Sequence, residues 1–70
     1  MLDATTRIDA LPVKLSAPAR RALAGAGIET LADLARHTER EVLALHGMGP
    51  ASIPTLRQAL AEAGLGFASA

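Results

Sequence analysis

The chain has 70 residues and no net charge, because seven Lys and Arg side chains balance seven Asp and Glu side chains. A chain of this length forms one domain, since folding buries only about 60% of its surface and cannot supply two cores. The balance of charge excludes a global field that attracts nucleic acid or anionic membranes, so any polyanion must bind locally. The absence of Cys excludes disulfides, thiol catalysis and Cys-ligated metal sites.

The composition predicts an all-α fold. Half of the residues are hydrophobic, Leu and Ala are frequent, and Phe67 is the single aromatic residue. Leu and Ala favour helices, whereas the β-branched and aromatic residues that favour strands are scarce. No stretch approaches the roughly 20 apolar residues that span a bilayer, and no signal-peptide pattern is recognised. We therefore expect a cytoplasmic protein without membrane contact.

The chain divides into three predicted segments. Residues 1–7 have no clear hydrophobic period and predict a flexible N-terminal lead. Residues 8–66 carry the helical pattern and form the predicted domain, and residues 67–70 form a C-terminal tail. At the start of the domain, Pro12 breaks any regular element, so we expect one helical turn and then an extended link. This link is expected to lay three side chains on the core: Leu11, Val13 and Leu15.

The first long helix is predicted over residues 17–26. Ser16 is a good N-cap, and Pro18 lies in the first turn, where its missing N–H breaks no hydrogen bond. Gly27 can adopt the left-handed conformation that ends a helix. Ile28 is then expected to fold back onto the helix in a Schellman motif.

Two capping boxes predict two short helices. In each box a Thr is followed three positions later by an acidic residue, and each side chain bonds a backbone N–H of the other. The pairs are Thr30–Asp33, which starts a helix over residues 31–36, and Thr38–Glu41, which starts a helix over residues 39–45. The inner face of the second helix is expected to contain Val42, Leu43 and Leu45.

The start of the last helix has two interpretations. If the helix opens at Pro50, then Pro54 lies one turn inside it and removes a hydrogen bond; if Ser52 caps it, Pro54 is harmless. We favour the start at Pro50, with a strained turn at Pro54, because a phosphate site needs a helix that opens at the hairpin. The helix is expected to bury Ile53, Leu56 and Leu60, to end at Ala63 before Gly64, and to be met by Leu65.

Two similar stretches lie 22 residues apart, Leu23-Ala-Gly-Ala-Gly-Ile-Glu-Thr30 and Leu45-His-Gly-Met-Gly-Pro-Ala-Ser52. Both continue the pattern Leu-x-Gly-apolar-Gly-x-x-Ser/Thr-apolar-x-x-Leu. A repeat in so short a chain predicts one small unit used twice, with each half burying the apolar face of the other. We interpret it as a doubled helix-hairpin-helix, in a compact domain of four to five helices.

The second Gly-x-Gly turn is a candidate phosphate site. Gly47 and Gly49 let a phosphate oxygen approach the backbone, and Met48 anchors the turn in the core. The following helix presents free N–H groups and its positive dipole end, and Ser52 adds a hydroxyl donor after Ala51. In the alternative interpretation, the two glycines only close a tight turn between helices.

Three basic residues are candidate phosphate contacts. Arg20 and Arg21 form the only adjacent basic pair, and Arg57 lies in the last helix. Arginines contact phosphates without specifying sequence, although each of these side chains can equally belong to a solvated helix face. The predicted DNA-binding set is Arg20, Arg21, Gly47, Gly49, Ala51, Ser52 and Arg57.

The remaining residues do not suggest catalysis. His37 and His46 have no third ligand at metal spacing and no assignable nucleophile, so we interpret both as surface or cap residues. Phe67 alone gives no stacking platform for single-stranded nucleic acid. We expect no enzymatic activity, no metal and no cofactor.

The region from Leu11 to Phe67 resembles a known family. The pattern Leu15-Ser16, Ala26-Gly-Ile-Glu-Thr-Leu31, Asp33-Leu34, Thr38-Glu39 and Gly49-x-x-Ser52 is similar to the C-terminal domain of the bacterial RNA polymerase alpha subunit. The stretches Leu45–Pro50, Ala59–Glu62 and Gly64-Leu65 are closer to small stand-alone bacterial helix-hairpin-helix proteins of that superfamily, which are described as DNA-binding. Nothing resembles the assembly domain of the subunit, so the chain is either free-standing or an excised domain.

The resemblance carries site residues over by position. The polymerase domain holds the DNA minor groove with an arginine two residues after the leading Ser, an asparagine three further on, and a Gly-x-Lys-Ser segment. These positions fall here on Pro18, Arg21, Gly49, Ala51 and Ser52. Two charged contacts are therefore replaced by Pro18 and Ala51, which argues against A-tract recognition of the polymerase type.

We therefore predict a monomeric, non-enzymatic module that contacts the phosphate backbone of double-stranded DNA weakly and without strong sequence preference. The alternative is a protein–protein interaction domain that has lost its DNA contacts and binds a polymerase, a repair factor or another copy of itself. The zero net charge and the two replaced contacts favour this alternative.

Overall fold

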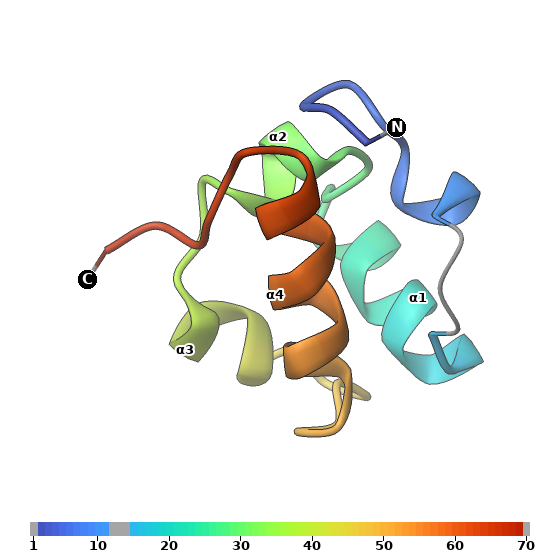
Figure 1. Cartoon of the computed structure of the whole chain (residues 1–70). Helices are drawn as coiled ribbons and strands as arrows, with labels where there is room; N and C mark the ends of the chain where they lie inside the picture. The colour runs from blue at the N-terminus through green and yellow to red at the C-terminus, as the bar shows by residue number, and fades with distance from the viewer. Residues whose placement is uncertain (1, 12–14, 70) are drawn as a thin grey trace.

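The computed structural model of the chain describes residues 2–11 and 15–69, and within them it is all-helical apart from one isolated bridge between Arg7 and Thr30. The elements, in chain order, are the 3-10 helix η1 (Ile8–Ala10) and the α-helices α1 (Ala17–Gly25), α2 (Leu31–Leu34), α3 (Glu39–Leu43) and α4 (Ser52–Glu62) (Figure 1). The predicted all-α class is confirmed. The predictions for Pro12, as the residue that breaks the first element, and for Val13, as a core residue, concern positions outside the described residues.

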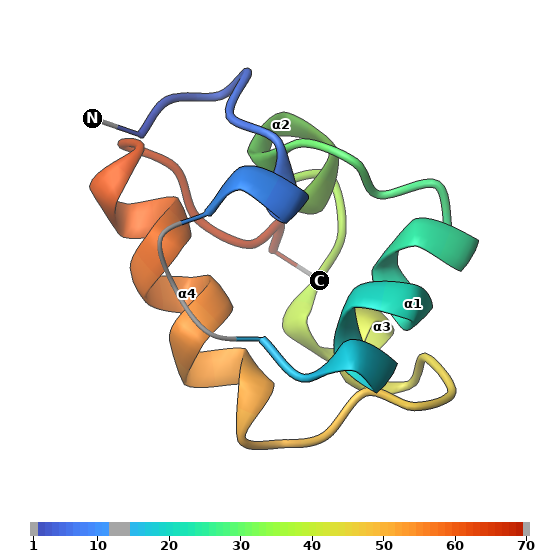
Figure 2. The same cartoon turned by 90° about the vertical axis from the view of Figure 1, so that its right-hand side faces the viewer.

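Helix α4 lies on one side of α1 and α3 (Figure 2) and supplies much of the core. Its buried face consists of Ile53, Leu56, Ala59 and Leu60, a spacing of three or four residues that places them on one side of a helix. They pack with buried residues of every other element: Ile8, Leu11, Leu15, Ala19, Leu23, Ile28, Leu31, Leu34, Val42 and Met48. The predicted burial of Met48 and of the inner face of the last helix is therefore confirmed.

The ends of α1 follow the sequence prediction. The Ser16 side chain accepts a hydrogen bond from the Ala19 N–H at 3.3 Å, and Pro18 lies in the first turn. At the other end Gly27 has a φ of 77°, and the Ile28 N–H donates to the Leu23 carbonyl oxygen at 2.9 Å. This is the Schellman arrangement, and its left-handed position accepts Gly without strain.

Both capping boxes are present, at the starts of α2 and α3. The helices are shorter than predicted, however, since they end at Leu34 and Leu43 rather than at residues 36 and 45. The prediction that Leu43 belongs to the inner face of this helix is wrong. Val42 is fully buried, but Leu43 is 44% exposed. In a helix of so few turns the buried arc is narrow, and of these two neighbours only Val42 joins the core.

The start of α4 also differs from both interpretations. The helix begins at Ser52, Ala51 occupies the N-cap position, and no side chain caps it. Pro54 is therefore the third helical residue, where the backbone N–H would have no partner inside the helix. The strained turn that we expected at Pro54 is absent from this described segment, because the helix starts two residues later than the favoured start.

The two terminal segments lie against the helical domain. Residues 4 and 6 accept backbone hydrogen bonds from Ala32 and Leu31, at 2.9 and 3.0 Å, and the Ile8 N–H donates to the Glu29 carbonyl oxygen at 2.8 Å. The segment assigned to a flexible lead is thus paired with the start of α2. At the other end, Phe67 packs half-buried against the core, and the Ala68 N–H donates to the His37 carbonyl oxygen at 2.9 Å.

Candidate nucleic-acid interface

The two halves of the repeat place their turns at opposite ends of α1 (Figures 1 and 2). The first hairpin, residues 26–30, follows the C-terminus of α1 and leads into α2. The second hairpin, residues 44–51, joins α3 to α4 and passes the N-terminal turn of α1: a Cβ on Gly47 would lie 3.3 Å from the Pro18 carbonyl oxygen. The repeat therefore offers two separate candidate phosphate sites.

The first hairpin has its own carboxylate in the position of an anion. The Asp33 side chain accepts hydrogen bonds from the backbone N–H groups of Glu29, at 3.1 Å, and Thr30, at 3.2 Å. The next two N–H groups, of Leu31 and Ala32, donate to the paired N-terminal segment. All four donors at the start of α2 are therefore occupied from within the chain, and a phosphate would have to displace a carboxylate.

The charge state of Asp33 fits this role. The N–H group of Glu29, followed by that of Thr30, lowers the pKa of the Asp33 carboxyl below its ordinary value, and the Thr30 hydroxyl and the Arg36 charge act in the same direction. Hydrogen bonds to the ionised form stabilise that form. The first hairpin consequently carries a fixed negative charge at neutral pH.

The second hairpin lacks such a carboxylate. Thr55 stands 22 residues after Asp33, at the equivalent position of the repeat. The Ser52 and Ile53 N–H groups donate to the carbonyl oxygens of Gly49 and Pro50, at 3.0 and 3.2 Å. Within the described residues, four other N–H groups of this segment donate to no protein acceptor: those of His46, Gly47, Gly49 and Ala51.

The open donors include two at the positive end of the α4 dipole. Gly49 and Ala51 lie within three residues before an 11-residue helix whose first turn carries no acidic residue. The prediction that the helix itself presents free N–H groups is wrong for its first three residues, because Ser52 and Ile53 donate to carbonyl oxygens of the hairpin and Pro54 has no N–H. The open donors lie just before the helix, where its dipole also favours an anion. Of the two repeats, the second hairpin is thus the one that can accept a phosphate from outside.

The glycines of the two repeats are not equivalent in conformation. In the first copy the second glycine, Gly27, has a positive φ, whereas in the second copy the first glycine, Gly47, does so, with a φ of 91°. Gly49 does not need a left-handed conformation, and a Cβ added there would meet no atom within 4 Å. The absence of a side chain at Gly49 therefore leaves open space beside its N–H.

A basic notch lies where the second hairpin meets α1. This surface depression of about 300 Å³ is lined by Pro18, Arg21, Ala22, His46 and Gly47. Arg21 and His46 are both exposed, and Arg21 forms no ion pair with the rest of the described chain. The structure thus brings Arg21 beside Gly47, whereas the other predicted hairpin residues, Gly49, Ala51 and Ser52, do not line this notch.

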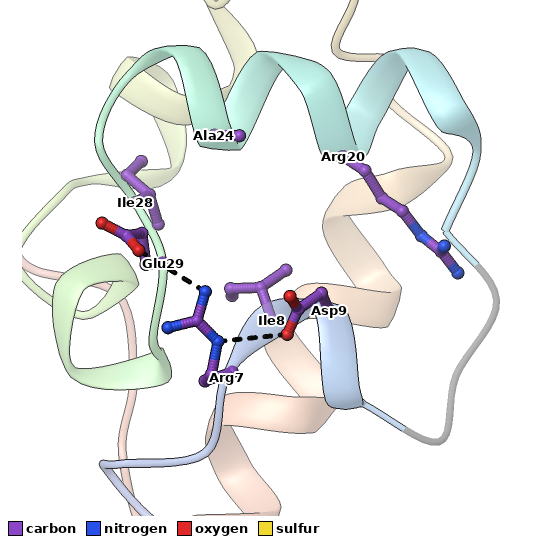
Figure 3. Close-up of a pocket in the computed structure, with 7 residues that line it drawn as sticks. All are labelled: Arg7, Ile8, Asp9, Arg20, Ala24, Ile28 and Glu29. Carbon is purple, nitrogen blue, oxygen red and sulfur yellow. Dashed lines mark hydrogen bonds and ion pairs between the residues drawn. The ribbon is translucent and has the colours of Figure 1, made fainter.

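The other two candidate arginines lie elsewhere. Arg20 lines a different pocket together with Ala24, Ile28 and the ion-paired Arg7, between α1 and the N-terminal segment (Figure 3). Arg57 donates to the Glu39 carboxylate through Nε at 2.7 Å and through a second nitrogen, which ties α4 to α3. Neither side chain lines the basic notch.

Sequence reasoning did not include His46 in the site. Its proximity to Arg21 depends on how the second hairpin packs on α1, and the two residues lie 25 positions apart in the sequence. In the described part of the chain, no group of three His, Asp or Glu side chains is arranged to hold a metal ion. No helix there is long and apolar enough to cross a membrane.

The comparison with protein families gives a match over residues 3–62 to the C-terminal domain of the alpha chain of bacterial RNA polymerase. The chain belongs to this family. The family is a non-catalytic domain that binds DNA and mediates protein interactions in transcription. Comparison with curated proteins gives no significant match.

Membership of the family confirms the resemblance deduced from the sequence. The match begins at residue 3, inside the segment that pairs with α2. Pro18 and Ala51, the two positions at which the resemblance implies charged contacts, carry no charge in this chain.

Proposed function

We propose that this domain is a non-enzymatic module that binds the phosphate backbone of duplex DNA at the second hairpin, weakly and without strong sequence preference. The observation that carries the proposal is the contrast between the two hairpins. The first is occupied by Asp33, whereas in the second the N–H groups of Gly49 and Ala51 have no acceptor among the residues that the structure describes.

The binding chemistry needs only groups that the hairpin supplies. A phosphate oxygen accepts hydrogen bonds from the Gly49 and Ala51 N–H groups, and the dipole of α4 adds to the attraction. Arg21 contacts a neighbouring phosphate from α1, because it lines the notch beside Gly47 of the same hairpin. Phosphate contacts of this kind fix the position of the protein without specifying the sequence.

The affinity is expected to be low because the charge is local. The chain has zero net charge, and Ala51 offers no side-chain cation where the polymerase domain has a lysine. If about three phosphates are neutralised, log K falls with log[salt] with a slope of about −2.7. A protein of this kind binds all duplexes with similar affinity.

A pair of glycine variants tests the proposal. Gly49→Ala places a methyl group in the second hairpin without meeting any protein atom within 4 Å. Gly25→Ala, at the end of α1 in the first repeat, also meets no atom within 4 Å but lies away from the second hairpin. We expect Gly49→Ala to weaken duplex binding at least about tenfold, because the phosphate oxygen can no longer approach the backbone. Gly25→Ala should leave the affinity unchanged.

The measurement is fluorescence anisotropy with a short labelled duplex of mixed sequence, at two salt concentrations, after circular dichroism has shown that both variants are folded. A salt-independent affinity, or equal effects of the two variants, would contradict the proposal. The cytoplasmic setting and the monomeric state are part of the same proposal, and sedimentation over a range of concentrations tests the latter.

A protein-interaction function is the second candidate, and the exposure of Leu43 favours it. Leu43 lies with Pro50 and Pro54 along a depression of about 430 Å³ between α3 and α4, bordered by Arg40 and by the Arg57–Glu39 ion pair. Exposed apolar side chains that gather in this way mark interaction surfaces. If this function holds instead, Leu43→Arg abolishes binding to the partner or self-association, and Gly49→Ala has no effect.

A further inference from the structure

His46 stands in the basic notch as a second nitrogen-bearing side chain. It is exposed, it lies on the second hairpin, and it shares the depression with Arg21 of α1 and with Gly47. Its own backbone N–H is among the open donors of the hairpin. A phosphate held in this depression would lie beside both the Arg21 and the His46 side chains.

The charged surroundings of His46 are simple. Helix α1 contributes three residues to the lining of the notch. Arg21 is charged, and Pro18 and Ala22 are uncharged. From the hairpin, no carboxylate lines the depression. The notch thus has no internal anion for the imidazolium, in contrast to the first hairpin with Asp33.

We propose that His46 is a phosphate-contacting residue whose protonation adds a second cation to Arg21, so that the domain binds DNA more tightly as the pH falls. This inference rests on the proposed function. An imidazole gains its proton between about pH 5 and 8, and the phosphodiester stays charged throughout that range. Protonation therefore adds one cation–phosphate contact to a site whose other donors do not change.

The expected change in Kd with pH is small, because the contact between the imidazolium and the phosphate is exposed to solvent. One exposed ion pair changes Kd by up to about fivefold. The slope of log K against log[salt] should also steepen by about 0.9, because one more phosphate is neutralised. The salt slope and the affinity thus report the same protonation independently.

His37 provides a matched control. It is half-buried, its carbonyl oxygen accepts the Ala68 N–H, and it does not line the basic notch. A change in His37 therefore removes an imidazole from the molecule without changing the notch.

The experiment measures Kd for one duplex at about pH 5.5 and about pH 8, at constant ionic strength, for the wild type, His46→Gln and His37→Gln. The wild type and His37→Gln should bind up to about fivefold more tightly at the lower pH, and His46→Gln should bind equally at both. Circular dichroism at each pH shows whether each protein is folded.

The outcomes separate this inference from the proposed function. Binding with the same pH dependence in His46→Gln, or a pH-independent wild type, overturns the role of His46 and leaves the proposed function intact. If no protein binds the duplex at either pH, the proposed function fails and the inference fails with it.

Discussion

At the scale of single residues, one position of the repeat decides which hairpin can bind an anion. Asp33 caps the N–H groups of Glu29 and Thr30 in the first copy, and Thr55 at the equivalent position leaves the second copy open. A carboxylate that satisfies backbone donors from within the chain also repels an incoming phosphate. A single side chain thus separates a structural turn from a candidate binding turn.

Arg21 is expected to contribute one phosphate contact, since it is the arginine that lines the notch. Arg21→Ala should weaken binding to all duplexes alike and reduce the salt slope from about −2.7 to about −1.8. Arg20→Ala is the control, because Arg20 lines the separate pocket of Figure 3. Anisotropy titrations at several salt concentrations measure both slopes. An equal loss of DNA affinity in the two variants would contradict a specific role for the notch, because Arg20 does not line it.

The capping carboxylates predict how stability depends on pH. Backbone N–H groups lower the pKa of Asp33, and the Thr38 N–H lowers that of Glu41. A depressed folded-state pKa contributes stability above the ordinary value, near pH 4, that is lost as the pH falls through the lowered value. Thermal melts should therefore show a falling midpoint below about pH 4. In Asp33→Asn this fall should be smaller; an unchanged acid profile would show that Asp33 does not contribute.

At the scale of the elements, the short helices depend on their caps. Helix α3 has only five residues, and its Thr38 side chain accepts the Glu41 N–H at 3.1 Å. An isolated helix of this length is unstable, so the capping bond and tertiary packing hold it. Thr38→Ala should cost about 1 kcal/mol of unfolding free energy, whereas Thr38→Ser keeps the hydroxyl and should cost less. Urea denaturation measures both, and equal losses would indicate that the methyl group matters more than the cap.

The sequence was a good guide to those parts of the elements that local chemistry determines. The caps of α1, α2 and α3 and the left-handed Gly27 all depend on hydrogen bonds within a few residues, and all were predicted correctly. The start of α4 was not predicted correctly, because the positions of Pro50 and Pro54 are compatible with several first residues for the helix. Packing selects one of these starts. Similarly, the exposure of Leu43 depends on where α4 lies.

The candidate site was only partly predictable for the same reason. The glycines of the second hairpin identified it as a candidate site. Whether its backbone N–H groups are free for a ligand depends on hydrogen bonds among the described residues, which the sequence pattern does not predict. The placing of Arg21 and His46 in one notch, and of Arg57 against Glu39, comes from contacts between distant segments. Residue type alone could not separate Arg20 from Arg21.

At the scale of the whole molecule, stability depends on a small core centred on α4. Leu56 is fully buried there, and truncating such a side chain to Ala costs about 2–5 kcal/mol. A domain of this size has a total stability of about 4–10 kcal/mol, so Leu56→Ala should be largely or partly unfolded at 25 °C. Leu43→Ala is the matched control, and its exposed side chain should change stability by less than about 0.5 kcal/mol. A large loss in the control would mean that Leu43 is covered in solution, as in a self-associated form.

The domain as a whole combines a family fold with zero net charge. The match over residues 3–62 includes both hairpins, and the two positions at which the resemblance implies charged contacts hold Pro18 and Ala51. A site that depends on backbone donors, one arginine and one histidine is expected to bind DNA weakly. Such a site would serve where another domain or a partner supplies most of the affinity.

The most direct test of this account is an amide chemical-shift titration of the labelled domain with a short mixed-sequence duplex at low salt, repeated at higher salt. The two hairpins serve as site and internal control in one sample. We predict salt-sensitive shifts at Gly47, Gly49, Ala51 and Arg21, with Glu29 and Thr30 unaffected because Asp33 occupies their N–H groups. Shifts concentrated at the first hairpin, or no shifts at high duplex concentration, would contradict the account and direct attention to the α3–α4 surface around Leu43.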